Sequence, residues 1–286
     1  MVDNKRFKIQ PKHVFALVIM YLVSTWILSY LIDIRNIFNL QRYVRNFHRG
    51  LLWFQLYKEA QITEILQWSF LGSSMLMCGY MWGKLKTMGS QYTYKFFLFM
   101  GLGSTIMMME DAGNVRHNMK EYTHYLFGAT TTVTVMTEMV FYTMLGAIMM
   151  FAIIGYGPYV WHAVKTRFYL ITGFGAYMVA SIASATRDIN DWYEIAGKWI
   201  HEVVFHNIML DRFGYVGFYI MDVLIEESIE LIGASAIFCG IFAYLRFIED
   251  NKELIDQEYQ LNGLFARLMR HPRSILVRKS GGHHGL

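Results

Sequence analysis

Long apolar stretches separated by short polar segments form the dominant pattern of this chain. A helix needs roughly 20 consecutive apolar residues to cross about 30 Å of hydrocarbon. Buried helices of soluble proteins seldom reach that length, so the pattern predicts an all-α, multi-pass membrane helix bundle. The six predicted spans are residues 14–32, 62–83, 95–115, 125–155, 168–186 and 213–247.

The segments between and after these spans are expected to lie at the membrane surface. Residues 35–57 mix arginines with aromatic side chains, which is typical of an amphipathic helix in the interface. The last span is too long to be wholly embedded, so we expect it to tilt or to project from the membrane. We therefore predict one membrane-embedded domain over residues 1–250, followed by a charged cytoplasmic-side tail over 251–286.

Composition supports the membrane assignment and limits the classes of partner. The 286 residues are 55% apolar and only 17% charged, whereas soluble proteins carry about 25% charged residues. Cys78 and Cys239 each lie in an apolar run, which argues against a disulfide framework. The expected partners are the lipid bilayer and other membrane subunits or further copies of the chain. Nothing in the sequence indicates nucleic-acid binding.

Basic residues in the flanks predict the orientation of the spans. They cluster near both chain ends, which favours cytoplasmic termini in a plasma or inner membrane. The apolar run at 14–32 is too long for a typical signal peptide, and no small-residue cleavage site follows it. We expect it to be retained as the first span.

Acidic residues inside the predicted spans are the main candidates for function. An ionised side chain at mid-membrane costs roughly 2.5 to 3.5 kcal/mol, so such residues need partners or a role. With the predicted topology, all of them fall in the outer half or the middle of the membrane. A shared polar site would account for this placement of Glu64, Glu110, Asp111, Glu138, Asp222, Glu226, Glu227 and Glu230.

Helical spacing assigns these residues to two faces. Asp222, Glu226 and Glu230 recur every four residues, which predicts one face of the last span. A second polar seam is predicted if the third helix continues past residue 115. That seam would consist of Glu110, Asn114, His117, Glu121 and His124.

A transition-metal centre is the first interpretation of the cluster. Helical bundles use Glu and His on facing helices to hold two iron or manganese ions, and oxygen and imidazole donors suit these metals. We predict a metal-dependent membrane oxidoreductase that holds two iron ions. It would carry out redox chemistry on an apolar or lipid-soluble substrate. The predicted ligands are Glu64, Glu110, His117, Glu138, Glu226 and Glu230, with Asp111, Asp222 and Glu227 as supporting or proton-transfer groups.

Two alternatives remain open on the sequence alone. Acid chains inside membranes also mark proton relays and cation pathways. The acids would otherwise be structural, paired with basic side chains in a non-enzymatic subunit of a larger membrane complex. The basic candidates for such pairs are Arg116, Arg187, Lys198 and Arg212.

Overall fold

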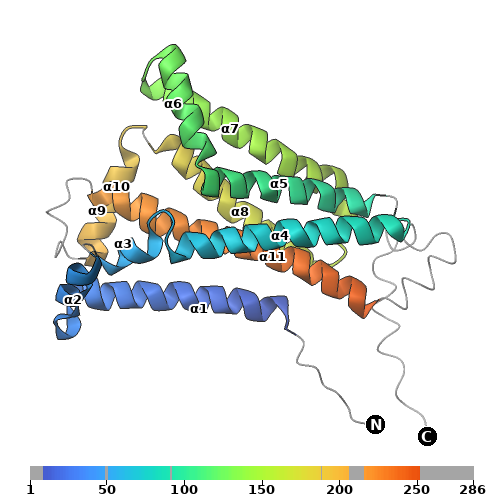
Figure 1. The fold of residues 1–286 in the computed structure, drawn as a ribbon, viewed down its shortest axis with the longest axis horizontal. Coiled ribbons are helices and arrows are strands. Elements are labelled where there is room, and N and C mark those ends of the chain that lie inside the picture. The colour runs from blue at the N-terminus through green and yellow to red at the C-terminus, as the bar shows by residue number, and fades with distance from the viewer. Residues whose placement is uncertain (1–8, 49–50, 91, 188, 206–215, 252–286) are drawn as a thin grey trace, which may run out of the picture.

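The computed structural model describes residues 9–48, 51–90, 92–187, 189–205 and 216–251. Every element in these residues is helical, which confirms the all-α prediction. The long helices lie side by side along one direction (Figure 1). They are α1 (Pro11–Ser29), α4 (Ile62–Thr87), α5 (Thr93–Gly113), α7 (Thr131–Phe151), α8 (Val164–Thr186) and α11 (Glu227–Asp250).

Shorter elements extend or connect the long helices. Three of them are π-helical: η1 (Tyr30–Ile34) continues α1, η3 (Ala152–Tyr156) continues α7, and η5 (Ile220–Glu226) leads into α11. The others are η2 (Ile37–Asn39), α2 (Leu40–His48), α3 (Leu52–Tyr57), α6 (Val115–Phe127), η4 (Gly157–Tyr159), α9 (Trp192–Phe205) and α10 (Val216–Tyr219).

Four helical segments are long and apolar enough to cross a membrane, namely Pro11–Ile34, Thr131–Tyr159, Val164–Thr186 and Gly217–Asp250. Their outward faces carry large apolar side chains such as Leu17, Met144 and Val179, which are 60%, 65% and 53% exposed. Soluble monomers rarely expose apolar surface of this extent. The four helices indicate an integral membrane protein.

The two other predicted spans correspond to α4 and α5, which are long but more polar. They contain 26 and 21 residues, and α4 carries Glu64, Lys84 and Lys86. Their passage across the membrane stays a prediction. Residues 35–57 form η2, α2 and α3, and their position at the interface is likewise a prediction.

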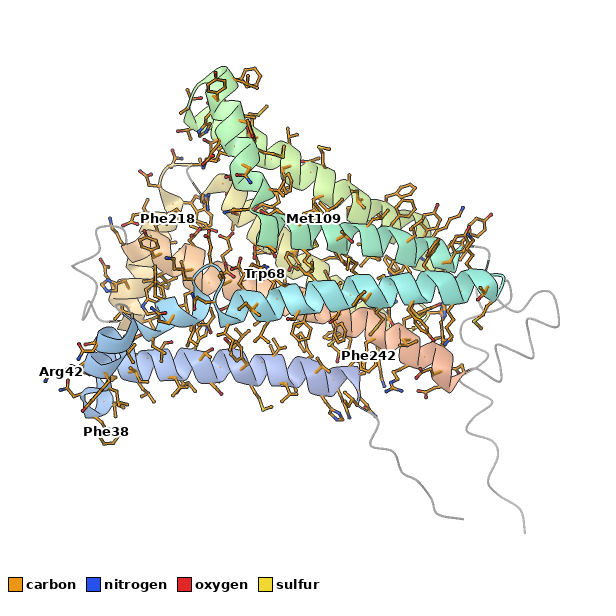
Figure 2. All side chains as sticks on the ribbon, in the orientation of Figure 1. Phe38, Arg42, Trp68, Met109, Phe218 and Phe242 are labelled. Atoms are coloured by element: carbon orange, nitrogen blue, oxygen red, sulfur yellow. The ribbon has the colours of Figure 1, made fainter. Side chains whose placement is uncertain are left out.

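The beginning of α1 and the end of α11 lie at the same end of the bundle (Figure 1). Nη2 of Arg246 donates to the carbonyl of Ile9 at 3.4 Å, and Sγ of Cys239 donates to that of Pro11 at 3.4 Å. The opposite end, which we call the acidic end, contains the beginnings of α4, α7 and α11. In Figure 2, Phe218 marks the acidic end and Phe242 lies toward the other.

Two glycines let α8 and α11 approach closely. A Cβ atom at Gly173 would lie 2.9 Å from the carbonyl oxygen of Gly233, closer than real Cβ contacts allow. Small residues at helix crossings permit such backbone contact in membrane proteins. Polar residues lie one turn from these glycines on α8 and on α11, and the crossing sets how they face one another.

The predicted seam along the third span is wrong because the helix breaks. α5 ends at Gly113, and Asn114 has a left-handed φ of 52°, after which α6 starts in a new direction. A left-handed residue commonly ends a helix, and asparagine tolerates it. The fourth long helix correspondingly begins at Thr131 rather than at residue 125. Residues 213–215 and the predicted tail, 252–286, lie outside the described residues.

Candidate functional site

The predicted acids gather at the acidic end, and six of the eight belong to two groups. The Gln67 cluster is built from α4, α5, α8 and α11, and the Arg187 group from α6, α7, α8 and η5. We define the Gln67 cluster as Gln67, Glu110, Asp111, Tyr177, Glu227 and Glu230. We define the Arg187 group as Lys120, Glu138, Arg187 and Asp222.

The side chain of Gln67 joins two acids that lie far apart in the sequence. Its Nε2 donates to Oδ2 of Asp111 at 2.5 Å and to Oε2 of Glu230 at 2.9 Å. Gln67 is 0% exposed, and its Oε1 has no hydrogen-bond partner among the described residues. The amide therefore connects three helices and still has one unused acceptor.

The importance of Gln67 is not predicted from the sequence, although a signal exists. Gln67 follows Glu64 by three residues, so both lie on one side of α4. An amide in an apolar environment needs hydrogen-bond partners to offset its desolvation. Inspection of amides as well as charged residues within the apolar runs would have identified it.

Further carboxyl groups surround the two that Gln67 bridges. Glu110 precedes Asp111 in α5 and interacts electrostatically with its side chain. Glu227 interacts electrostatically with Glu230 and Glu64, and its Oε2 is buried with no hydrogen-bond partner in the described part of the chain. The structure thus brings together four predicted site residues, with Glu64 at their edge.

Tyr177 of α8 directs its phenol toward the same acids. Its Oη is buried, has no hydrogen-bond partner among the described residues, and interacts electrostatically with Asp111 and Glu230. A Cβ atom at Gly233 would lie 2.6 Å from Cδ2 of the Tyr177 ring. The absence of a side chain at Gly233 therefore leaves the space that the ring occupies.

The Arg187 group pairs its acids with basic side chains. Nη1 of Arg187 lies 3.0 Å from Oδ1 of Asp222, and its Nη2 lies 3.6 Å from Oε1 of Glu138. Nζ of Lys120 lies 3.7 Å from the same Glu138 oxygen. Glu138 is 1% exposed, so these cations provide the compensation that a buried carboxylate requires.

Glu226 and Glu64 have separate local partners. The Tyr193 hydroxyl donates to Oε2 of Glu226 at 2.5 Å. Burial, followed by the neighbouring Glu226 carboxylate, raises the pKa of Tyr193, so this phenol keeps the proton that it donates. The backbone amide of Ala60 donates to Oε2 of Glu64.

The three acids predicted on one face of the last span bond to different neighbours. Asp222, Glu226 and Glu230 contact side chains of α8, α9 and α4, respectively. Asp222 and Glu226 belong to the π-helical η5 and Glu230 to α11, so the three residues lie at successive turns and each reaches a different neighbouring element. Their common face on the last span stays a prediction.

The predicted metal ligands are not all neighbours. Glu138 belongs to the Arg187 group, Glu226 bonds to Tyr193, and the side chain of His117 lies outside the described part of the protein. Within the described residues, no group of three or more His, Cys, Asp or Glu side chains is arranged to hold a metal ion. The predicted transition metal, including a pair of iron ions, stays a prediction.

Comparisons with protein-family models, with curated proteins and with solved structures find no match to this chain. A fold of helices alone is compatible with many functions. The function is therefore argued from the geometry of the Gln67 cluster.

Proposed function

We propose that the protein is a proton-handling membrane protein that binds and transfers protons at the Gln67 cluster. The observation that supports this most directly is the shared amide of Gln67. It holds the carboxyl groups of Asp111 and Glu230 against each other from two different helices. A third carboxyl group, that of Glu110, interacts electrostatically with Asp111.

Electrostatics favour a proton at this position. Two ionised carboxylates roughly 5 Å apart repel by about 3 kcal/mol at an effective dielectric constant near 20. None of the ion pairs among the described residues involves Asp111 or Glu227. At Asp111 and Glu227, a bound proton neutralises the carboxyl group in the smallest volume.

Unused polar atoms around the acids provide positions for proton exchange. Oε1 of Gln67, Oη of Tyr177 and Oε2 of Glu227 are buried and have no hydrogen-bond partner among the described residues. Each of them can accept a hydrogen bond, and the phenol can also donate one. A proton shared by the acids can therefore move between positions without requiring an established hydrogen bond to break.

Two serines continue the polar surface toward the other end of the bundle. A Cβ atom at Gly101 would lie 3.2 Å from Cβ of Cys78, which fixes the antiparallel register of α4 and α5. Followed from this contact toward Gln67, the same register places Ser74 of α4 opposite Ser104 of α5. Both serines are 0% exposed, and their Oγ atoms have no hydrogen-bond partner in the described part of the chain. They support a route inward from the cluster.

Proton flux in liposomes tests this function. Purified protein is reconstituted around an enclosed pH dye, and flux is driven by a pH gradient with the membrane potential clamped. We expect flux with the native chain, and flux equal to that of protein-free liposomes with Asp111→Asn. Asp250→Asn, at the far end of α11, is the matched control and should transport normally. Native flux in both Asp111→Asn and Glu230→Gln would overturn the proposal.

The metal-dependent oxidoreductase is the competing function. It would use carboxylates of the same cluster as oxygen donors, and it requires further ligands to converge on them. Metal analysis of the purified protein separates the two functions. Stoichiometric iron, manganese or zinc that is lost in Glu230→Gln, without proton flux in the native chain, would replace the proton proposal with the metal centre.

A further inference from the structure

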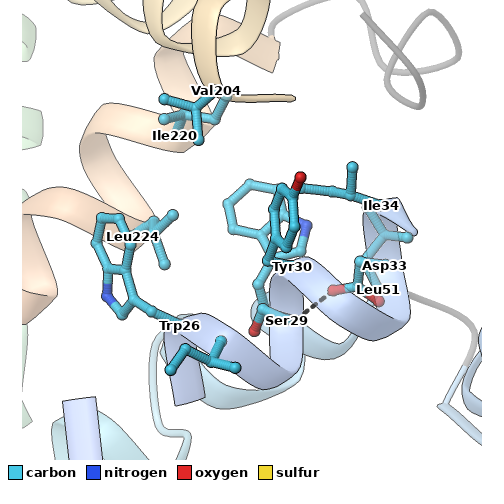
Figure 3. Close-up of a pocket in the computed structure, with 11 residues that line it drawn as sticks. Trp26, Ser29, Tyr30, Asp33, Ile34, Leu51, Val204, Ile220 and Leu224 are labelled. Carbon is cyan, nitrogen blue, oxygen red and sulfur yellow. Dashed lines mark hydrogen bonds between the residues drawn. The ribbon is translucent and has the colours of Figure 1, made fainter. Parts of the chain in front are cut away.

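An apolar cavity of about 250 Å³ lies at the acidic end, and none of its lining residues belongs to the Gln67 cluster. Figure 3 shows its walls, which come from the end of α1, η1, the beginning of α3, α9 and η5. Drug-sized ligand pockets begin at roughly 300 Å³, so this cavity suits a single chain better than a ring system. Its main walls are Trp26, Tyr30, Leu51, Trp53, Ile220 and Leu224.

Two π-helical segments contribute opposite walls of this cavity. Tyr30 and Ile34 belong to η1, and Ile220 and Leu224 belong to η5. π-Helical turns are rare and occur frequently at functional sites. Both π-helical segments border the same cavity, and this observation does not depend on the cavity volume.

The cavity wall contains one polar atom without a partner. Both carboxylate oxygens of Asp33 accept backbone amides at the beginning of α3, at 2.9 Å each. Nε1 of Trp26 donates to Oγ of Ser228 at 3.1 Å. Ser29 is 7% exposed, and its Oγ is buried without a hydrogen-bond partner among the described residues. The Ser29 hydroxyl is therefore available to an occupant of the cavity.

A positive charge lies next to the wall residue Tyr30. The guanidinium of Arg35 is 5.5 Å from the centroid of the Tyr30 ring, and its Nε donates to the Tyr30 hydroxyl at 3.0 Å. Arg35 forms no ion pair among the described residues. Residues 34–58 contain four arginines and one lysine but no acidic residue. The guanidinium of Arg35 is therefore suited to hold an anion beside the cavity.

We propose that this cavity binds one hydrocarbon chain of an anionic amphiphile, whose carboxylate or phosphate head is held by Arg35. A chain from the bilayer is already in hydrocarbon, so its burial here adds little driving force. Selectivity comes instead from the Arg35 charge and from a hydrogen bond that the Ser29 hydroxyl donates to an oxygen of the head or of its ester linkage. This site is separate from the proposed proton site and does not depend on it.

Fluorescence quenching tests the cavity because Trp26 and Trp53 lie in its wall. The full chain is placed in phosphatidylcholine nanodiscs that contain a small fraction of lipid with brominated chains. The brominated lipid is either phosphatidylglycerol or phosphatidylcholine at the same fraction. We expect the native chain to be quenched several-fold more by the anionic lipid. Equal quenching by the two lipids in the native chain would overturn the proposal.

Variants then separate the head from the chain. Arg35→Gln removes the charge, and Ser29→Leu fills the cavity, so each should reduce the preference to that of bulk lipid. Arg246→Gln is the matched control for the charge, because Arg246 lies at the opposite end of the bundle. Ser69→Leu is the matched control for the added side chain, because Ser69 is exposed on α4. Leu224→Phe fills the cavity from another wall in case Ser29→Leu does not fold. An unchanged preference in Arg35→Gln, or in a folded cavity-filling variant, would refute the assignment.

Native mass spectrometry of the purified protein distinguishes the two sources of the anionic head. A single adduct with the mass of a fatty acid would identify a carboxylate, and one with the mass of an acidic phospholipid would identify a phosphate. Either adduct supports the site if Ser29→Leu loses it and Ser69→Leu retains it. An adduct that both variants retain would place the lipid elsewhere and count against the cavity.

Discussion

The Gln67 cluster and the Arg187 group place acids in the same end of the bundle but neutralise them differently. In the Arg187 group, two basic side chains lie within 3.7 Å of the buried Glu138 carboxylate. In the Gln67 cluster, a neutral amide bridges Asp111 and Glu230, and further carboxyl groups lie beside them. An arginine neutralises a carboxylate permanently, whereas an amide leaves its charge to be set by a proton.

Under the proposed function, this difference gives each group a different role. Breaking a buried ion pair leaves an uncompensated charge, so the Arg187 group stabilises the arrangement of α6, α7, α8 and η5. The structural interpretation of the acids fits this group. The Gln67 cluster instead contains like charges in proximity, an arrangement that favours exchangeable protons over stability.

The largest effect is expected from removing the shared cation. Arg187→Gln removes the guanidinium that lies 3.0 Å from Asp222, and Lys120 then remains as the basic partner of Glu138 among the described residues. We expect the free energy of unfolding to fall by about 3 to 5 kcal/mol, as for other buried pairs that lose one member. Denaturant unfolding in detergent measures this loss. Arg246→Gln, which breaks an exposed pair with Glu249, should cost no more than about 1 kcal/mol.

Neutralising one acid in each group tests the contrast directly. Glu138→Gln should lower the free energy of unfolding by about 1.5 to 3 kcal/mol, because charge-assisted interactions are lost. Asp111→Asn removes like-charge repulsion and should change the free energy of unfolding by less than about 1 kcal/mol. The two variants are compared by the same unfolding measurement. Equal losses in both would show that the two groups do not differ in the proposed way.

The glycine crossing that positions Tyr177 provides the next test. Gly233→Ala puts a methyl group 2.6 Å from the Tyr177 ring, and overpacking of this kind costs about 1 to 3 kcal/mol. We also expect reduced proton flux, because the phenol moves away from the acids. Gly175→Ala is the control on α8, since nothing lies within 4 Å of its Cβ position. If Gly233→Ala matches this control in stability and flux, the crossing does not position the phenol.

The smallest effect on stability is expected from Tyr177→Phe. No hydrogen bond of Oη to a described residue is lost, so the free energy of unfolding should change by less than about 0.5 kcal/mol. Proton flux should nevertheless fall, because an exchange position has been removed. Parallel unfolding and liposome measurements separate these effects. Native flux in Tyr177→Phe would remove the phenol from the proposed route while leaving the carboxyl pair intact.

The sequence predicts the helices and the concentration of acids at one end, because both follow from local composition. It does not predict which helices adjoin, so Glu138 and Glu230 cannot be assigned to different groups beforehand. The break at Asn114 changes the direction of the side chains that follow it. Gln67 is missed because it is uncharged, although its amide organises the acids.

The crossing of α8 and α11 restricts which substitutions this protein can accept. At Gly233, any larger residue meets an aromatic ring, and at Gly173 it meets main-chain atoms that no rotamer change can move. These two positions depend on the absence of a side chain rather than on any chemical group. Two glycines and the glutamine of α4, sixty residues or more apart, therefore form a signature by which divergent chains with the same site could be recognised.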